Sequence, residues 1–275
     1  MLIVELNDRN LLNIPTDAFL VGIKKYSSEC YKHFELADVV EIIKDIKKLN
    51  KKVFIDLTNV FHDADLECLK KDLEKIQDAD GFFYFDLGVM SLIEKEKRVY
   101  FAPTYLTNQF DINIAEEQNK YVLVSPEISL KELNNIKFSE SLILVAFGTW
   151  EIFHSRRPLI SNYFNYRNKE YKSDSKYQVI EEFRNDLYPI IENNGTKIYL
   201  NGYYYLGEEL KGKNASLLIK SFDLEKDIVT KIVDAYNNYL NDGEDIEANL
   251  RKLKIDLNKG LLYEESILKK GGANE

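Results

Sequence analysis

Short apolar segments rich in β-branched and aromatic residues recur along the first half of the chain and return near its end. Continuous apolar runs of this length are typical of strands that are buried on both faces. The strands predicted in this way are Leu2–Leu6, Ala18–Ile23, Lys52–Thr58, Gly81–Asp86, Val99–Thr104, Tyr121–Ser125, Leu142–Gly148, Lys197–Asn201 and Ser216–Phe222.

Apolar side chains at spacings of three and four predict helices between these strands. The clearest ones are Asp38–Lys48, Asp65–Ile76 and Leu224–Leu240. We expect Asp38 to cap the first helix, and Ser129 with Glu132 to form a capping box ahead of a short further helix. Alternation of strand and helix predicts a parallel sheet. Since no Gly-rich phosphate loop follows the first strand, the pattern favours an α/β fold of the TIM-like (β/α) barrel type, with some irregular repeats.

The alternation stops after Gly148. The segment that follows is polar and rich in Tyr and Asn, and it is too long for a plain connection, so we expect a functional insertion over residues 150–196. The barrel domain is expected to span residues 1–240 including this insertion. Residues 241–275 are expected to form a C-terminal helix and tail packed on the barrel, with a frayed end over Lys269–Glu275.

Composition narrows the class of protein. The 275 residues carry a net charge of −9, and their hydrophobic and charged fractions of 45% and 30% are those of a soluble globular protein. Two cysteines, Cys30 and Cys68, cannot form a disulfide framework or a four-thiolate metal site, which favours a reducing compartment. No secretory signal or long apolar run is present, so we expect a cytoplasmic protein without a membrane span.

The insertion has a charge opposite to that of the whole chain. The segment from His154 to Gln178 contains six Lys and Arg residues and two acidic residues, a local net charge of +4. Tyrosines are interleaved with the basic residues. Arginine binds phosphate groups and aromatic rings stack on unpaired bases, so this composition suits single-stranded or loop RNA. An equally good interpretation is a solvated insertion whose aromatic side chains pack on the barrel.

Polar residues follow several predicted strands, where a barrel places its functional face. Asn59 and His62 come after the third strand, and Asp86 and Glu127 come after two others. Each has a structural alternative, since a lone histidine is often structural and acidic residues favour helix N-termini. The three histidines and two cysteines show no zinc spacing, so we expect no metal site, and no G-x-S-x-G elbow supports a hydrolase.

Four segments together resemble a known family. They read K-K-V-F-I-D-L-T-N-V-F-H-D at 51–63, V-L-V-S-P-E-I-S-L-K-E-L at 122–133, F-G-T-W-E-I-F-H-S-R-R-P-L-I-S-N-Y-F at 147–164 and D-L-Y-P-I-I-E-N-N-G-T-K-I at 186–198. This set resembles the collagenase-like peptidase family U32, and most of all its short members associated with 5-hydroxylation of the wobble uridine in tRNA. The resemblance implies a TIM-like barrel, prephenate as oxygen donor and a longer family member as partner.

The chain departs from the family in its charged and cysteine positions. Many members hold an iron–sulfur cluster on four cysteines that have no counterpart here, so no cofactor is expected in this chain. A late strand usually similar to S-F-K-I-[DE]-G reads S-L-L-I-K-S at 216–221. Leu218 and Lys220 thus stand where the family has a lysine and an acid, and no nearby charge in the sequence obviously replaces them.

The leading hypothesis is therefore participation in tRNA wobble-uridine hydroxylation, as a partner-dependent or degenerate subunit that binds tRNA. The residues expected to line the barrel mouth as catalytic candidates are Asn59, His62 and Glu127. The residues expected to contact the RNA through phosphates or stacking are His154, Arg156, Arg157, Tyr163, Tyr166 and Arg167. Two alternatives stay open, namely a peptidase, as the family name says, and a non-catalytic scaffold for a longer homologue.

Overall fold

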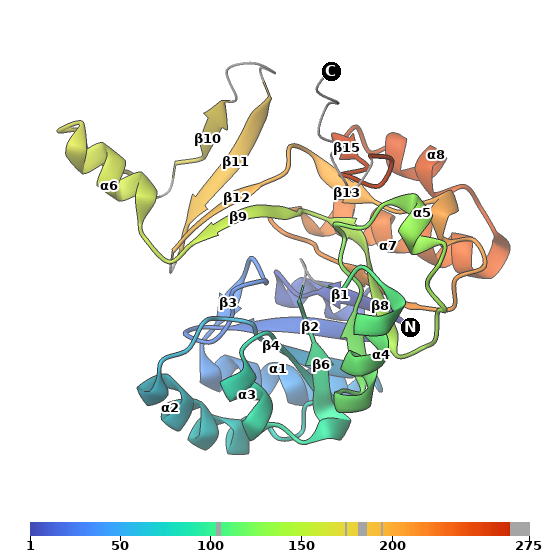
Figure 1. The fold of residues 1–275 in the computed structure, drawn as a ribbon, viewed down its shortest axis with the longest axis horizontal. Coiled ribbons are helices and arrows are strands. Elements are labelled where there is room, and N and C mark those ends of the chain that lie inside the picture. The colour runs from blue at the N-terminus through green and yellow to red at the C-terminus, as the bar shows by residue number, and fades with distance from the viewer. Residues whose placement is uncertain (103–105, 174, 181–185, 194, 265–275) are drawn as a thin grey trace, which may run out of the picture.

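Eight parallel strands close into a barrel with helices on its outside (Figure 1). The computed structural model describes residues 1–264 apart from 103–105, 174, 181–185 and 194. The barrel strands are β1 (Leu2–Glu5), β2 (Ala18–Ile23), β4 (Lys52–Leu57), β5 (Gly81–Tyr84), β6 (Arg98–Tyr100), β7 (Tyr121–Leu123), β8 (Leu142–Gly148) and β14 (Ser216–Ile219). The last strand closes the barrel, because Leu217 lies opposite Leu2 of β1 and Leu144 of β8. The predicted TIM-like barrel is confirmed.

Helices follow most of the barrel strands, as the periodicity predicts. The α-helices are α1 (Leu36–Lys48), α2 (Asp63–Leu73), α3 (Leu87–Leu92), α4 (Gln109–Gln118), α5 (Leu130–Leu133), α6 (Leu159–Tyr166), α7 (Lys226–Asp242) and α8 (Ile246–Arg251). Short 3-10 helices are η1 (Arg9–Asn13), η2 (Glu74–Ile76), η3 (Lys95–Lys97) and η4 (Glu208–Leu210). The barrel strands are buried almost without interruption, which explains why their sequence patterns are continuous rather than alternating.

The helix starts differ in part from the prediction. α1 begins two residues before Asp38, with Glu35 in the cap position, so the prediction that Asp38 is the cap was wrong; it lies in the first turn instead. There an acidic side chain still favours the positive end of the helix dipole. The predicted capping box of Ser129 and Glu132 is confirmed, since each side chain accepts the other's backbone N–H. Asp86 caps α3 by accepting the Gly88 N–H at 2.7 Å.

The segment predicted as an insertion forms a second, antiparallel sheet with one helix. Its strands are β9 (Glu151–Ser155), β10 (Tyr177–Ile180), β11 (Leu187–Glu192) and β12 (Thr196–Tyr199), in the spatial order β10-β11-β12-β9. We call these four strands with α6 the inserted sheet. The predicted strand Lys197–Asn201 is β12 and so belongs to this sheet, not to the barrel. In Figure 1 the inserted sheet lies across one end of the barrel, with α6 projecting at its far edge.

The C-terminal part returns to the barrel. β13 (Tyr203–Tyr205) pairs antiparallel with β8, and β15 (Leu257–Asn258) pairs with β13, while β3 (His33–Phe34) pairs with β2. Apolar side chains of α8 join the main core, and the Leu130 N–H donates to the Leu262 carbonyl at 2.6 Å. Residues 265–275, which include the end expected to fray, lie outside the described residues, as does Thr104 of the fifth predicted strand.

Candidate functional site at the barrel mouth

The inserted sheet covers the carboxyl ends of the barrel strands. Lys197 of β12 reaches down to the loop after β2, where its Nζ donates to the Ser28 carbonyl at 2.6 Å. Arg156, just beyond β9, reaches the start of α2, where its Nη2 lies 2.6 Å from His62 Nε2. The carboxyl ends of barrel strands are where this fold places its functional loops. The insertion therefore forms a wall and partial roof over the barrel mouth.

Four buried charged side chains alternate in sign beneath this roof. Lys220 Nζ lies 2.8 Å from Glu29 Oε2, and Lys197 Nζ lies 3.5 Å from Glu29 Oε1. On its other side, Lys197 Nζ lies 2.5 Å from Glu151 Oε2, an ion pair without hydrogen-bond geometry. All four side chains are less than one-fifth exposed. We call Lys220, Glu29, Lys197 and Glu151 the charge chain; it links β14, the loop after β2, β12 and β9.

Mutual pairing keeps Glu29, Lys197 and Lys220 of the charge chain ionised in spite of burial. Burial by itself raises the pKa of Glu29, but the two neighbouring ammonium groups outweigh it and lower that pKa to about 2. Burial lowers the pKa of Lys220 and Lys197, and the carboxylates beside them more than reverse the effect, so both pKa values lie above the usual lysine value. Opposite charges at these distances favour the charged forms. The mouth therefore holds two ammonium groups with the Glu29 carboxylate between them.

Two further acids fix the loop that carries Glu29. Asp56 of β4 accepts the backbone N–H groups of Glu29 and Cys30 at 3.0 and 2.8 Å. Glu5, at the end of β1, accepts the N–H groups of Tyr31 and Phe222. Burial raises the pKa of Glu5, and Lys220 opposes that rise. These carboxylates are used as acceptors for the backbone, so their role is to position Glu29.

The structure corrects the expectation that nothing replaces the family's lysine and acid near the end of β14. Lys220 itself points into the mouth, and Glu29, Lys197 and Glu151 come to it from three other elements. Sequence reasoning missed this group because its members lie far apart along the chain. One signal was available, since Lys197 and Lys220 each stand in an otherwise apolar strand segment, where an unpaired cation is costly.

A small cavity lies beside the charge chain inside the barrel. Its walls combine Phe101, Pro126, Val145 and Trp150 with Glu29, Glu151, Lys220 and Thr149, and its volume is about 20 Å³. The Thr149 hydroxyl is buried and has no hydrogen-bond partner in the part of the chain that the structure describes. A cavity with apolar walls, one free hydroxyl and charged groups at its edge can hold one water-sized polar group.

The three candidates predicted at the mouth are not brought to one point. Asn59 lines the groove under the inserted sheet, where its amide donates to the Lys25 carbonyl at 3.0 Å. His62 precedes α2, its side chain is exposed, and it contacts Arg156. Glu127 is half-buried next to Pro126, and burial raises its pKa. Glu127 does not cap α5, since Ser129 does. Their catalytic role stays a prediction.

The basic and aromatic candidates lie on the outer parts of the inserted sheet. His154 lines the groove and its Nδ1 lies 3.2 Å from Glu151 Oε1. Arg157 is exposed beside Arg156. Tyr163 and Tyr166 of α6 are 58% and 83% exposed. These values do not fit the interpretation that they pack on the barrel.

The remaining candidate, Arg167, ends α6 and is exposed. The aromatic residues of this region that pack do so locally, because Phe164 contacts Tyr171 and Tyr177. The exposed rings and guanidinium groups are thus accessible to a partner, and RNA binding by them stays a prediction.

The chain's own residues do not fit the iron–sulfur cluster that the family resemblance implies. Cys30 is buried in the loop after β2, and Cys68 is exposed on α2. Among the described residues, no three His, Cys, Asp or Glu side chains are grouped so that they can hold a metal ion. No helix in the described part of the chain is long and apolar enough to cross a membrane.

The chain is similar to known proteins along most of its length. A family model described as Peptidase family U32 matches residues 9–261. The tRNA hydroxylation protein P2 of Bacillus subtilis (strain 168) is 25% identical over 203 residues, which cover 68% of this chain and 66% of the relative's length. Two solved structures are more distant. The U32 peptidase Mk0906 has 13% identity and a TM-score of 0.48, over 79% of this chain and 91% of that chain.

The second, the spore cortex-lytic enzyme SleL of Bacillus cereus, has 9% identity and a TM-score of 0.38, over 79% of this chain and 70% of that chain. The family match, by contrast, runs from the first residue of η1 to just beyond β15, and it includes the whole inserted sheet. The protein therefore belongs to peptidase family U32.

Proposed function

We propose that this protein takes part in tRNA hydroxylation at the wobble uridine, with the inserted sheet as its RNA contact surface. The observation that carries the proposal is the exposure of the Arg and Tyr side chains on the outer parts of the inserted sheet, from Arg156 beside the barrel mouth to Tyr166 on the projecting helix α6. The similarity to a tRNA hydroxylation protein supports the same assignment. We also propose a cytoplasmic location, where the protein meets its tRNA.

We assign the parts of the RNA and the oxygen donor to different groups of the site on the basis of charge and exposure. Arg156, Arg157 and Arg167 are proposed to bind phosphates, because guanidinium groups fit phosphate oxygens, and Tyr163 and Tyr166 to stack on unpaired bases. The charge chain and the cavity beside it are proposed to receive the oxygen donor. Prephenate is the donor we propose, from family resemblance, and Lys220 is the ammonium group that lines the cavity. A longer family member is proposed as partner.

The experiment that tests this function is nucleoside mass spectrometry of tRNA from cells that lack the gene. We expect 5-hydroxyuridine derivatives to fall sharply, and to return when the wild-type gene is supplied. Retention of wild-type levels in a strain without any second copy of the gene contradicts the proposal.

A second experiment distinguishes a catalytically active subunit from a non-catalytic scaffold. Cells are complemented with Lys220→Met or with the surface control Lys48→Met on α1, which removes an exposed ion pair to Asp45, and the amount of folded protein is measured in each case. An active subunit requires that Lys220→Met fails to restore the modification although folded protein is present. Full restoration by Lys220→Met assigns the chain to the scaffold role beside a longer homologue.

A further inference from the structure

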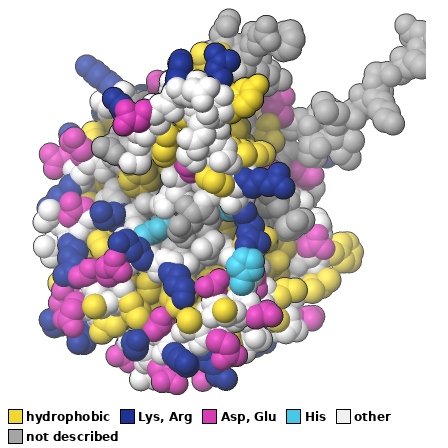
Figure 2. Space-filling model, turned by 90° about the vertical axis from the view of Figure 1, so that its left-hand side faces the viewer, with side chains coloured by type: hydrophobic (Ala, Val, Ile, Leu, Met, Phe, Trp, Pro, Cys, Tyr) yellow, Lys and Arg dark blue, Asp and Glu magenta, His cyan; other side chains and the backbone are white. Residues whose placement is uncertain are grey.

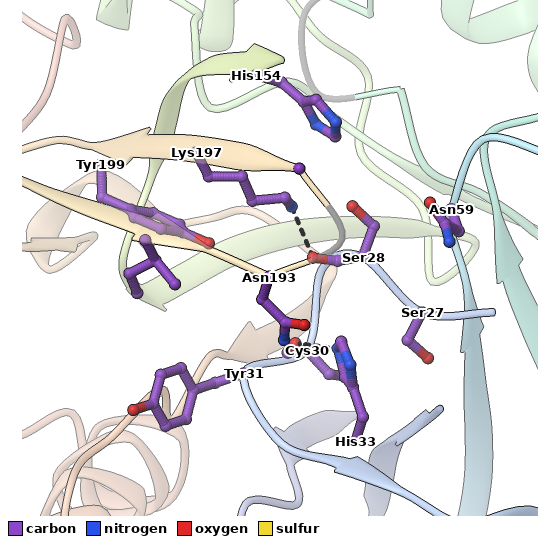
Figure 3. A pocket seen from close by; sticks show the side chains of 12 residues that line it. Ser27, Ser28, Cys30, Tyr31, His33, Asn59, His154, Asn193, Lys197 and Tyr199 are labelled. Atoms are coloured by element: carbon purple, nitrogen blue, oxygen red, sulfur yellow. Dashed lines mark hydrogen bonds between the residues drawn. The ribbon is translucent and has the colours of Figure 1, made fainter. Parts of the chain in front are cut away.

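A polar groove separates the inserted sheet from the face of the barrel. Its walls come from the loop after β2, the residues just after β4, β9 and the residues on either side of the turn between β11 and β12, and its volume is about 50 Å³. Figure 3 shows Tyr31 and Tyr199 toward one side, and Asn59 and His154 toward the other. We call this hollow the side groove. It adjoins the cavity inside the barrel, because Lys197 lines the groove and pairs with Glu29 and Glu151, which line the cavity, although the two hollows share no lining residue.

One end of the side groove offers a supported aromatic ring. Tyr31 packs on Phe222 with ring centroids 4.5 Å apart, and Phe222 packs on Tyr199 at 5.3 Å. Tyr31 is nevertheless 42% exposed. The Tyr31 N–H also donates to the buried carboxylate of Glu5, which fixes the backbone beneath the ring. A ring that is held from behind and open in front loses little freedom when a flat ligand stacks on it.

Unused hydrogen-bonding groups face the middle of the side groove. In Figure 3 the Asn193 amide extends from its hairpin toward the His33 imidazole. Within the part of the chain that the structure describes, the side chains of Asn193 and Ser28 have no hydrogen-bond partner. Asn59 differs from them, because its amide bonds to the Lys25 carbonyl and to the Val60 N–H. Asn193 and Ser28 are therefore the groups available to a ligand.

The rim beyond the side groove is cationic. Arg156 follows His154 by two residues, just beyond the end of β9, and contacts His62 at the start of α2. The histidine side chains in Figure 2 lie beside Lys and Arg side chains across the boundary between the barrel and the inserted sheet. An open aromatic face, an amide with both donor and acceptor, and a guanidinium at the rim match the base and phosphate of one nucleotide.

We propose that the side groove receives one unpaired pyrimidine base of RNA, stacked on Tyr31 and hydrogen-bonded along its edge by Asn193 and Ser28. This inference rests on the proposed function and adds the residues that hold the target base. The edge of uracil presents acceptor, donor and acceptor in turn, and an amide pairs with two of these neighbours while a hydroxyl serves the third. Arg156 holds the phosphate on the outer side.

The test uses a tRNA anticodon stem-loop with 4-thiouridine at the wobble position as a photo-crosslinking probe. The full-length protein, with its partner if one co-purifies, is irradiated with the probe and the linked peptide is mapped by mass spectrometry. We expect links within residues 27–33 or 191–199. A link to any other segment, or no link while filter binding shows that the stem-loop is bound, overturns the base-binding assignment and leaves the proposed function in place.

Two variants sharpen the result. Asn193→Ala and Tyr31→Leu are expected to lower the yield of the link by about fivefold or more, the reduction typical of removing one base-stacking or hydrogen-bonding group. Asn214→Ala, an exposed asparagine far from the groove at the start of β14, is the matched control and is expected to leave the yield unchanged. Failure of the wild type to bind the stem-loop at all contradicts both the base-binding assignment and the RNA contact in the proposed function.

Discussion

The Lys220 ammonium group lies 2.8 Å from the Glu29 carboxylate, and this pair ties the strand that closes the barrel to the loop after β2. Both side chains are buried at the mouth, under the inserted sheet. Their pairing explains how a lysine is tolerated at the end of an apolar strand, because the carboxylate replaces the water that the ammonium loses. Glu29 also pairs with Lys197 of the inserted sheet. Ion pairs therefore connect the inserted sheet with the barrel.

Replacing Lys220 by Met is expected to lower the free energy of unfolding by about 3–5 kcal/mol, because Glu29 is left buried with only Lys197 beside it. The measurement is urea denaturation. The matched control, Lys176→Met, removes an ion pair to Asp223 from a side chain that is 89% exposed, and is expected to cost about 0–1 kcal/mol. Equal losses in the two variants contradict the role given to the buried pair.

Acid is expected to destabilise the protein through Glu29. Its pKa is about 2 in the folded chain against an ordinary value of 4.5, so the stabilisation is present above pH 4.5 and is lost as the pH falls from there toward 2. Glu5 acts in the opposite direction, because its raised pKa favours the protonated form on folding. Unfolding free energies measured between pH 7 and pH 2.5 should fall less steeply in Glu29→Gln than in wild type.

The double substitution of Arg156 and Arg157 by Ala is expected to weaken tRNA binding and to reduce the slope of log K against log salt by about 2, one for each phosphate that is no longer neutralised. Binding is measured at several salt concentrations. Arg9→Ala with Arg251→Ala is the control, since both arginines are exposed away from the inserted sheet. An unchanged slope in the Arg156 and Arg157 variant rules out the assigned phosphate contacts.

Tyr166→Ala is expected to reduce RNA affinity by about 1–3 kcal/mol while leaving stability within about 0.5 kcal/mol, because the ring is 83% exposed and packs on little. Phe110→Ala on α4 is matched for exposure, at 82%, and is expected to leave RNA affinity unchanged. Affinity is read by fluorescence anisotropy with a labelled stem-loop. A decrease of equal size in both variants shows a nonspecific surface effect.

Gly148→Ala is expected to destabilise the fold at the mouth itself. Gly148 has a φ of +140°, and a Cβ there lies 2.5 Å from the Lys220 Cβ and 2.7 Å from its carbonyl oxygen. The backbone conformation costs about 1–3 kcal/mol for a residue with a Cβ, and the overlap about 1–3 kcal/mol more. Thermal unfolding is measured for Gly148→Ala and for Gly212→Ala. Since nothing lies within 4 Å of a Cβ at Gly212, the difference between the two variants measures the cost of the overlap at Gly148. Destabilisation at Gly148 no larger than that at Gly212 contradicts the overlap.

The barrel and the place where it is interrupted could both be predicted from the amino-acid sequence. Apolar runs such as Leu142–Gly148 are continuous because those strands are buried on both faces, and that pattern is visible without coordinates. The polar, basic segment after Gly148 likewise marked the insertion, since its composition cannot fill a core. Local caps were predicted where one side chain meets a nearby N–H, as at Ser129. These features depend on neighbours within a few residues.

The pairing of charges at the mouth, by contrast, follows from the tertiary structure. Glu29 is separated from Lys197 and Lys220 by well over a hundred residues, and no periodicity connects a loop residue with two strand ends. The same holds for Arg156 and His62, which the sequence assigned to different roles and the fold places 2.6 Å apart. Burial and pairing set the charge state of such groups, and both depend on how distant segments close around the barrel mouth.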